Sequence, residues 1–295
     1  MQMLPWFTAT YATLLSRYLA KKLHHGLLLT GPEGIGKHRL AIGLANALLC
    51  KRPGADGPCE QCQSCQLRHA GNHPDFHTLE SEKQLGVDKI REGIAKLSGT
   101  AQMGGNKVLL IPSAGSMTEA AANALLKTLE EPTNNTFLLL ITDNINKLMP
   151  TILSRCERQL LPLPSVSESL NYLQAKGVED ASEALLAAYG YAPLRVEEAL
   201  SGDNDFSYRD FSDGIQALLA GDANLQAQTL ASKWQDNAQQ VALWCQQMAH
   251  DDYMQRQQVV DFNRYKTCVE AVKTLEHAGV NKSMVLFGLL KQFQR

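Results

Sequence analysis

Short apolar runs alternate with amphipathic stretches over the first half of the chain. Residues 27–29, 107–111 and 137–141 are almost continuously apolar and are flanked by turn residues, as is typical of buried parallel strands. Apolar residues recur at helical spacing around these runs, and a further strand is predicted over 158–163. The predicted helices cover residues 8–22, about 38–50, 87–97, 118–131 and 145–153. Strands that alternate with helices predict a parallel sheet covered on both faces.

The second half of the chain shows helical periodicity and no convincing strand. Its predicted helices cover residues 169–176, 181–189, 194–200, 211–219, 225–234, 241–254, 259–275 and 283–293. Prolines at 162 and 164 mark one domain boundary, and the polar run 202–205 marks another. We therefore expect an α/β domain over 1–164, a small helical domain over 165–203 and an all-α domain over 204–295. The apolar stripes predict bundle core, with a partner-binding face as the alternative.

Composition describes a globular chain of more than one domain. Of its 295 residues, 44% are hydrophobic and 20% are charged, and the net charge of −2 provides no global basic field for nucleic acid. Apolar runs stay short of the roughly 18 residues that span a bilayer. The N-terminus lacks the basic start and long apolar core of a signal peptide. We expect a cytoplasmic protein that does not enter a membrane.

The segment after the first strand has the spacing of a phosphate-binding loop. Gly31, Gly34, Gly36 and Lys37 fit the pattern in which backbone N–H groups and one lysine surround a phosphate. A working loop continues with Ser or Thr, whose hydroxyl binds Mg²⁺, but this chain has His38. The pattern predicts a nucleotide site with a defect. The alternative is that the glycines and Lys37 form a structural turn.

Two further positions lack the groups that ATP hydrolysis needs. In a P-loop ATPase, the strand matching 107–111 ends in acidic residues that assist Mg²⁺ and polarise the attacking water. Here Pro112 and Ser113 follow that strand, and the next carboxylate is Glu119. Electrostatic stabilisation is usually the largest part of such catalysis, so we expect no ATP hydrolysis. Lys37 leaves weak nucleotide binding open.

Four of the seven cysteines lie between residues 50 and 65. Cys59, Cys62 and Cys65 are each separated by two residues, and Cys50 stands at a predicted helix end. An odd number of cysteines in a chain expected to be cytoplasmic disfavours disulfides and favours a metal site. Four thiolates close a tetrahedral shell around Zn²⁺, which predicts a structural zinc module. The alternatives are unliganded thiols, an iron–sulfur cluster, or a site in which one ligand is His69, His73 or His77.

Arg155 follows the third apolar run and its short helix, in the sequence Ser154-Arg155-Cys156. An arginine presented by one subunit can reach the γ-phosphate bound by the next. Its guanidinium is a permanently charged fork for phosphate oxygens. An arginine in a loop is by itself an ordinary solvated charge, so Arg155 becomes a candidate only together with the other motifs.

These motifs together resemble the clamp-loader branch of the AAA+ family. The resemblance rests on the glycine loop, the four cysteines, the stretch Asn-Ala-Leu-Leu-Lys-Thr-Leu-Glu-Glu-Pro at 123–132 and the triplet around Arg155, and it covers about residues 1–200. It implies an AAA+ P-loop core with a parallel sheet over 1–164 that carries the zinc module. It also implies a helical lid over 165–203 and a C-terminal helical collar over 204–295.

The resemblance also implies a function. Clamp loaders are rings that open a sliding clamp and load it on primed DNA, and the degenerate site is similar to that of the non-hydrolysing stator in the bacterial DNA polymerase III ring. The implied partners are the delta and gamma or tau subunits, with the clamp and primer-template DNA reached through the complex. Arg155 is then an arginine finger for a neighbour's ATP, Thr142 a sensor residue of the nucleotide site, and Arg195 a candidate lid arginine.

Two other functions remain as alternatives. One is an active clamp-loader ATPase of gamma or tau type, against which the missing acidic pair argues. The other is a zinc-dependent DNA-binding module, against which the net charge and the lack of a basic, aromatic patch around residues 59–65 argue. ATP turnover by the isolated chain separates the first alternative from a stator.

Overall fold

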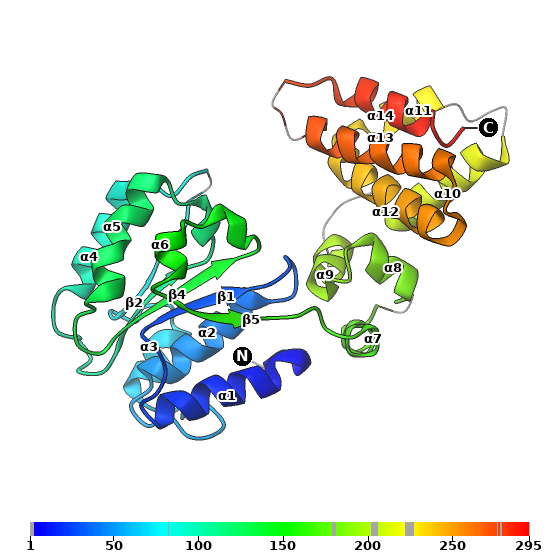
Figure 1. The fold of residues 1–295 in the computed structure, drawn as a ribbon. Coiled ribbons are helices and arrows are strands. Elements are labelled where there is room, and N and C mark those ends of the chain that lie inside the picture. The colour runs from blue at the N-terminus through cyan, green and yellow to red at the C-terminus, as the bar shows by residue number, and fades with distance from the viewer. Residues whose placement is uncertain are drawn as a thin grey trace. The chain divides into compact units, whose positions relative to one another are not determined.

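In a computed structural model of the chain, the described residues are 3–294 apart from 82, 179–180, 202–205, 222–226, 276 and 278. They divide into a first unit, Met1–Glu168, and a second unit, Ser169–Arg295 (Figure 1). The predicted polar linker at 202–205, and with it the predicted boundary between lid and collar, lies outside the described residues, as does the start of the helix predicted from 225. The division into three domains stays a prediction.

The first unit is built on a five-stranded parallel sheet, as the apolar runs predict. Its strands stand in the order β2-β3-β4-β1-β5. Their bounds are β1 Gly26–Thr30, β2 Phe76–Thr78, β3 Lys107–Ile111, β4 Thr136–Thr142 and β5 Glu157–Leu160. Every residue of β1 and β3 is buried, as expected for strands covered on both faces. Strand β2 was not predicted, because Phe-His-Thr is neither an apolar run nor an alternating pattern.

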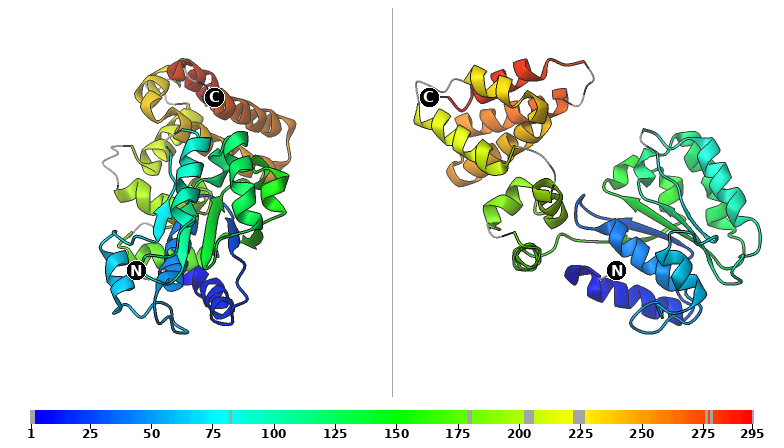
Figure 2. Two further views of the ribbon diagram at one scale, coloured as in Figure 1. Left: turned by 90° about the vertical axis from the view of Figure 1, so that its left-hand side faces the viewer. Right: turned by 180° about the vertical axis from the view of Figure 1, so that it is seen from behind.

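Helices cover both faces of this sheet (Figures 1 and 2). They are α1 Thr8–Leu19, α2 Lys37–Leu49, α3 Gln63–His69, α4 Val87–Leu97, α5 Glu119–Glu130 and α6 Pro150–Leu153. Helix α4 has its predicted bounds, and Thr118 caps α5 by accepting a hydrogen bond from the backbone N–H of Ala121 at 3.2 Å. The single helix predicted over 145–153 is wrong: a 3₁₀ turn at Ile145–Lys147 ends before Pro150, which begins α6.

Helices are the regular secondary structure of the second unit, with no strand among its described residues, in agreement with the periodicity. Its helices are α7 Val166–Ala175, which starts just before the unit, α8 Glu183–Ala188, α9 Pro193–Ser201, α10 Tyr208–Ala220, α11 Ala227–Lys233, α12 Ala238–Arg256, α13 Val259–Leu275 and α14 Lys282–Leu290. Trp244 lies in its core, with ring centroids 5.1 Å from Phe211 and 5.6 Å from Tyr189. The described helices include none with the length and apolar character to span a membrane.

Candidate functional site

The glycine loop lies at the carboxyl end of β1, where the chain turns into α2. Gly34 and Gly36 have φ angles of 75° and 91°, which favour glycine, and Gly36 is the N-cap of α2. Gly31 is packed so closely that a Cβ there would lie 2.2 Å from the carbonyl oxygen of Leu161. Packing of the chain against itself therefore requires glycine at position 31, whether or not a phosphate binds.

The side chain of Lys37 turns back onto this loop. It is only 5% exposed, and its Nζ donates to the carbonyl oxygens of Gly31 at 2.8 Å and Pro32 at 2.6 Å. The same Nζ forms an ion pair with Asp143 Oδ1 at 2.5 Å. The lysine that would hold a phosphate thus has three oxygen partners within its own chain.

Asp143 was not identified from the sequence, although a signal for it exists. Strands β1 and β4 are parallel neighbours, and Thr30 stands opposite Thr142 in their register. The residue after Thr142 must therefore lie beside the start of the glycine loop. The predicted sensor, Thr142, is buried, and its Oγ1 donates to the carbonyl oxygen of Asn144 at 3.0 Å and accepts from its N–H at 3.2 Å.

Three further positions bear on the predicted defect at the carboxyl end of the sheet. His38 is exposed on the first turn of α2, and Pro112 and Ser113 follow β3, so none of these three positions carries a carboxylate or a P-loop hydroxyl. Trp6, which was not predicted to contact this loop, donates its indole N–H to the carbonyl oxygen of Ile35 at 2.9 Å. The loop is thus held by contacts from within the unit.

Arg155 lies two residues after the end of α6 and is about one-third exposed. Its Nε donates to Glu130 Oε1 at 2.6 Å, and its Nη2 forms an ion pair with the same oxygen. Its Nη1 donates to the carbonyl oxygen of Thr151 at 3.0 Å. The guanidinium is therefore held at the surface in one orientation.

Arg155 and the glycine loop lie at opposite ends of the sheet. A Cβ built on Gly26, the first residue of β1, would lie 3.4 Å from the carbonyl oxygen of Arg155, whereas Gly31 follows the last residue of the same strand. Five residues of β-strand extend about 13–16 Å. Arg155 and Lys37 therefore cannot hold the same phosphate within one chain.

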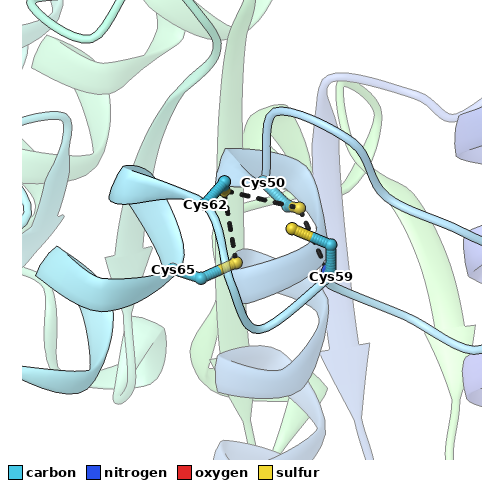
Figure 3. A group of neighbouring side chains, drawn as sticks. All are labelled: Cys50, Cys59, Cys62 and Cys65. Atoms are coloured by element: carbon cyan, nitrogen blue, oxygen red, sulfur yellow. Dashed lines mark hydrogen bonds between the residues drawn. The ribbon is translucent and has the colours of Figure 1, made fainter.

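The four predicted cysteines converge, as Figure 3 shows. Their Sγ atoms all lie within 4.8 Å of one another, with Cys62 to Cys65 at 3.5 Å and Cys50 to Cys62 at 3.9 Å. A tetrahedron of sulfurs about 2.3 Å from a central Zn²⁺ has edges of about 3.8 Å, so the arrangement fits such an ion. Cys50 ends α2 and Cys62 is the N-cap of α3, so the cluster joins two helix ends.

Backbone N–H groups support the sulfurs. The N–H groups of Cys59 and Arg52 donate to the Cys50 sulfur at 3.2 and 3.4 Å. Hydrogen bonds from the N–H groups of Gln61 and Cys62 lower the pKa of Cys59 to about 6, whereas burial raises the pKa of Cys50. Metal binding would displace the remaining thiol protons.

None of the three histidines that were alternative ligands belongs to this sulfur group in the described structure. His73 is buried, where its Nε2 lies 2.7 Å from Ser64 Oγ and its Nδ1 accepts from the backbone N–H of Asp75 at 3.1 Å. In the neutral ring, Nε2 therefore carries the proton and donates to Ser64, which donates to the carbonyl oxygen of Leu49 at 2.6 Å. This chain of hydrogen bonds connects the end of α2 to the start of α3 beside the cysteines.

Comparison with known proteins agrees with the motifs. The family described as "DNA polymerase III, delta subunit" matches residues 8–165. DNA polymerase III subunit delta' of Pseudomonas aeruginosa is 42% identical over 238 residues, covering 78% of this chain and 70% of that protein. The Escherichia coli subunit delta' is 40% identical over 210 residues, covering 69% and 63%.

A solved structure supports the fold. The crystal structure of a DNA polymerase III gamma subunit-related protein from Thermotoga maritima aligns with a TM-score of 0.56 at 18% identity, covering 96% of this chain and 98% of that chain. At this identity the structural match supports only the arrangement of the helices and strands, whereas the sequence matches show which family the chain belongs to. The chain therefore belongs to the family described as DNA polymerase III, delta subunit, and the two bacterial relatives that it matches are delta' subunits.

Proposed function

We propose that this chain is the non-hydrolysing delta' subunit of a bacterial DNA polymerase III clamp loader, which helps to place a sliding clamp on primed DNA. Its partners are the delta and gamma or tau subunits, and it meets clamp and primer-template DNA through the assembled complex. Family membership and the named delta' relatives support the subunit. The separation of Arg155 from the glycine loop supports the division of roles.

In this proposal the carboxyl end of the sheet does not support hydrolysis, because position 38 carries no hydroxyl and no carboxylate directly follows β3. Lys37 is committed to two loop carbonyls and Asp143, and His38 stands where a hydroxyl would bind Mg²⁺. Any nucleotide that entered the loop would have to displace Asp143 from Lys37 and would find no Mg²⁺ ligand at position 38. The loop residues Gly31, Gly34 and Gly36, with Thr142, thus serve as scaffold.

The amino end of the sheet carries the group that acts. Arg155 is held at the surface next to the start of β1, away from its own loop. A guanidinium in this place serves the γ-phosphate of a neighbouring subunit, where it offsets the charge that develops during phosphoryl transfer. In this proposal Arg155 is a catalytic residue of the neighbour's site, and the chain has no ATPase activity of its own within the holoenzyme.

The cysteine cluster is proposed to hold a structural Zn²⁺ through Cys50, Cys59, Cys62 and Cys65. Bound zinc would complete its shell with four thiolates and leave no open position for a substrate. Its effect is to fix the end of α2, the helix that follows the glycine loop, to the start of α3.

The test is ATP turnover by the reconstituted ring and by the isolated chain. Because one finger serves one of three ATP sites in such a ring, Arg155→Ala should lower turnover by about one third if the sites are independent, and by more if they are coupled. Arg158→Ala is the matched control, since Arg158 is an exposed arginine of β5 without a side-chain partner among the described residues.

Two results would contradict the proposal. One is unchanged turnover when Arg155→Ala is assembled into the ring at wild-type stoichiometry. The other is Mg²⁺-dependent ATP hydrolysis by the isolated wild-type chain that Lys37→Ala abolishes, because that activity would place a working site at the glycine loop.

A further inference from the structure

Glu130 is the last residue of α5 and the closest charged partner of Arg155. Its Oε1 accepts from both Nε and Nη2 of Arg155, so one carboxylate oxygen holds one edge of the guanidinium. Glu130 is 49% exposed and Arg155 32% exposed, so the pair stands at the surface. Glu130 belongs to the stretch 123–132, one of the segments on which the family resemblance rests, and this contact connects that stretch to Arg155.

The contacts of Arg155 leave one N–H of Nη2 without a partner among the described residues. Glu130 occupies the Nε edge, and Nη1 donates to the carbonyl oxygen of Thr151 at 3.0 Å and to Ser154 Oγ at 3.3 Å. An arginine offers five N–H donors in a rigid plane, so the remaining Nη2 N–H and the Nη1 N–H that makes the longer 3.3 Å contact with Ser154 can face a phosphate end-on. The carboxylate therefore fixes the plane along the Nε–Nη2 edge, next to the Nη1–Nη2 end that a phosphate would approach.

The helix end that carries Glu130 is itself fixed to the sheet. The carbonyl oxygen of Leu129 lies 2.7 Å from Nε2 of His25, and the Leu129 side chain is buried against Gly26 at the start of β1. Glu130 thus stands on a rigid element. A side chain held from such an element keeps its geometry better than one held from a loop.

We propose that Glu130 is a positioning residue, which holds the guanidinium of Arg155 in the orientation that meets the γ-phosphate of the neighbouring subunit. The inference rests on the proposed function of Arg155. A long side chain that is already ordered within its own subunit loses no further conformational entropy when the ring closes. Its interaction with the phosphate can then stabilise the transition state without that cost.

The experiment measures ATP turnover of the reconstituted ring against the concentration of this chain, for wild type, Glu130→Ala, Glu130→Gln, Arg155→Ala and the double variant Glu130→Ala/Arg155→Ala. The part of turnover that depends on the finger is the difference between wild type and Arg155→Ala. Glu130→Ala should lower this part about tenfold, the usual size of a lost hydrogen bond to a charged group. The concentration for half-maximal turnover should not change, because the residue orients the finger and does not hold the ring together.

Two variants separate positioning from folding. Glu130→Gln keeps an acceptor oxygen for Nε and Nη2 and should recover at least half of the lost turnover. Glu131→Ala removes the neighbouring carboxylate, which has no side-chain partner in the described part of the chain, and should match wild type. In the Arg155→Ala background, Glu130→Ala should have no further effect.

The possible outcomes distinguish the inference from the proposed function. If Arg155→Ala slows the ring while Glu130→Ala turns over like wild type, the role of Glu130 is wrong and that of Arg155 stands. If Glu130→Ala is faster than wild type, the carboxylate competes with phosphate and the inference is also wrong. If Arg155→Ala has wild-type turnover, the finger itself is refuted, and the role of Glu130 with it.

Discussion

Replacement of Lys37 by Met tests whether the glycine loop is a scaffold or a nucleotide site. Met preserves the length and the apolar stem of the lysine but removes the Nζ, which is buried and donates to Gly31 and Pro32. It also removes the ion pair with Asp143. A scaffold that depends on these contacts should lose folding stability even when no nucleotide is present.

The size of the loss follows from the burial of each partner. A hydrogen bond from a charged donor contributes about 1.5–3 kcal/mol, and the Gly31 carbonyl belongs to a buried residue that would lose this donor. Asp143 is 56% exposed, so its ion pair adds about 0–1 kcal/mol. Release of the buried charge offsets part of the sum. We expect Lys37→Met to lower the free energy of unfolding by about 2–4 kcal/mol and the Tm of the first unit by about 5–15 °C.

Calorimetry of the full chain without nucleotide measures this Tm. Lys127→Met is the matched control, because Lys127 is exposed on α5 and has no side-chain partner among the described residues. The Tm of Lys127→Met should equal that of the wild-type chain. If Lys37→Met also melts within about 1 °C of wild type, the contacts of Nζ do not stabilise the loop and the scaffold interpretation is refuted.

Three further changes test other parts of the structure. Cys59→Ser should remove most of the zinc found by elemental analysis of the purified chain and lower the Tm, because a hydroxyl is a poorer zinc ligand than a thiolate; zinc-free wild-type protein would contradict the metal site. Burial lowers the pKa of His73, so the unfolded chain binds a proton more readily, and stability in urea should fall as the pH drops below about 6.5. His73→Gln should flatten that dependence, and an unchanged slope would assign it to other groups. In the second unit, Gly214→Ala places a Cβ 2.7 Å from the Trp234 ring and should cost about 1–3 kcal/mol, whereas Gly288→Ala on α14 enters open space and should stabilise by up to about 1 kcal/mol; equal urea midpoints would refute this reasoning.

Elements with a strong local signal were predictable from the sequence. The residues of β1 and β3 are mostly apolar, apart from Thr30 and Lys107, and lie inside a sheet covered on both faces, so the burial of the apolar ones follows from composition. Helices α4 and α13 have their predicted bounds because apolar periodicity and flanking turn residues agree there. Local propensity and tertiary packing favour the same structure in these segments.

Elements that depend on distant partners were not predictable. Strand β2 has three residues and pairs only with β3, so its existence depends on an edge that the sequence does not show. Helix α3 was not predicted, because its seven residues have little apolar periodicity. It is anchored by the cysteine cluster and by Ser64, which connects His73 to the end of α2.

The candidate site shows the same limit. The motifs marked Lys37 and Arg155, but the residues that hold them, Asp143 and Glu130, come from other elements and belong to no nucleotide-binding pattern. For Asp143 the parallel register of β1 and β4 was the available signal. For Glu130 no spacing rule places the end of α5 beside Arg155, two residues after α6, since that contact depends on how both helices pack at the amino end of the sheet.

The separation of the two ends agrees with the proposed division of roles between the glycine loop and Arg155. At the carboxyl end, Lys37 and Gly31 are bound into the turn that joins β1 to α2, so their loss would damage folding even without a nucleotide. At the amino end, Arg155 has no hydrogen bond or ion pair with that turn in the described structure, and its proposed role depends on a neighbouring subunit that binds ATP. Substitutions at the two ends should therefore change different measured properties. Substitutions around Lys37 should change the folding stability of this chain, and those around Arg155 should change ATP turnover by a neighbouring subunit.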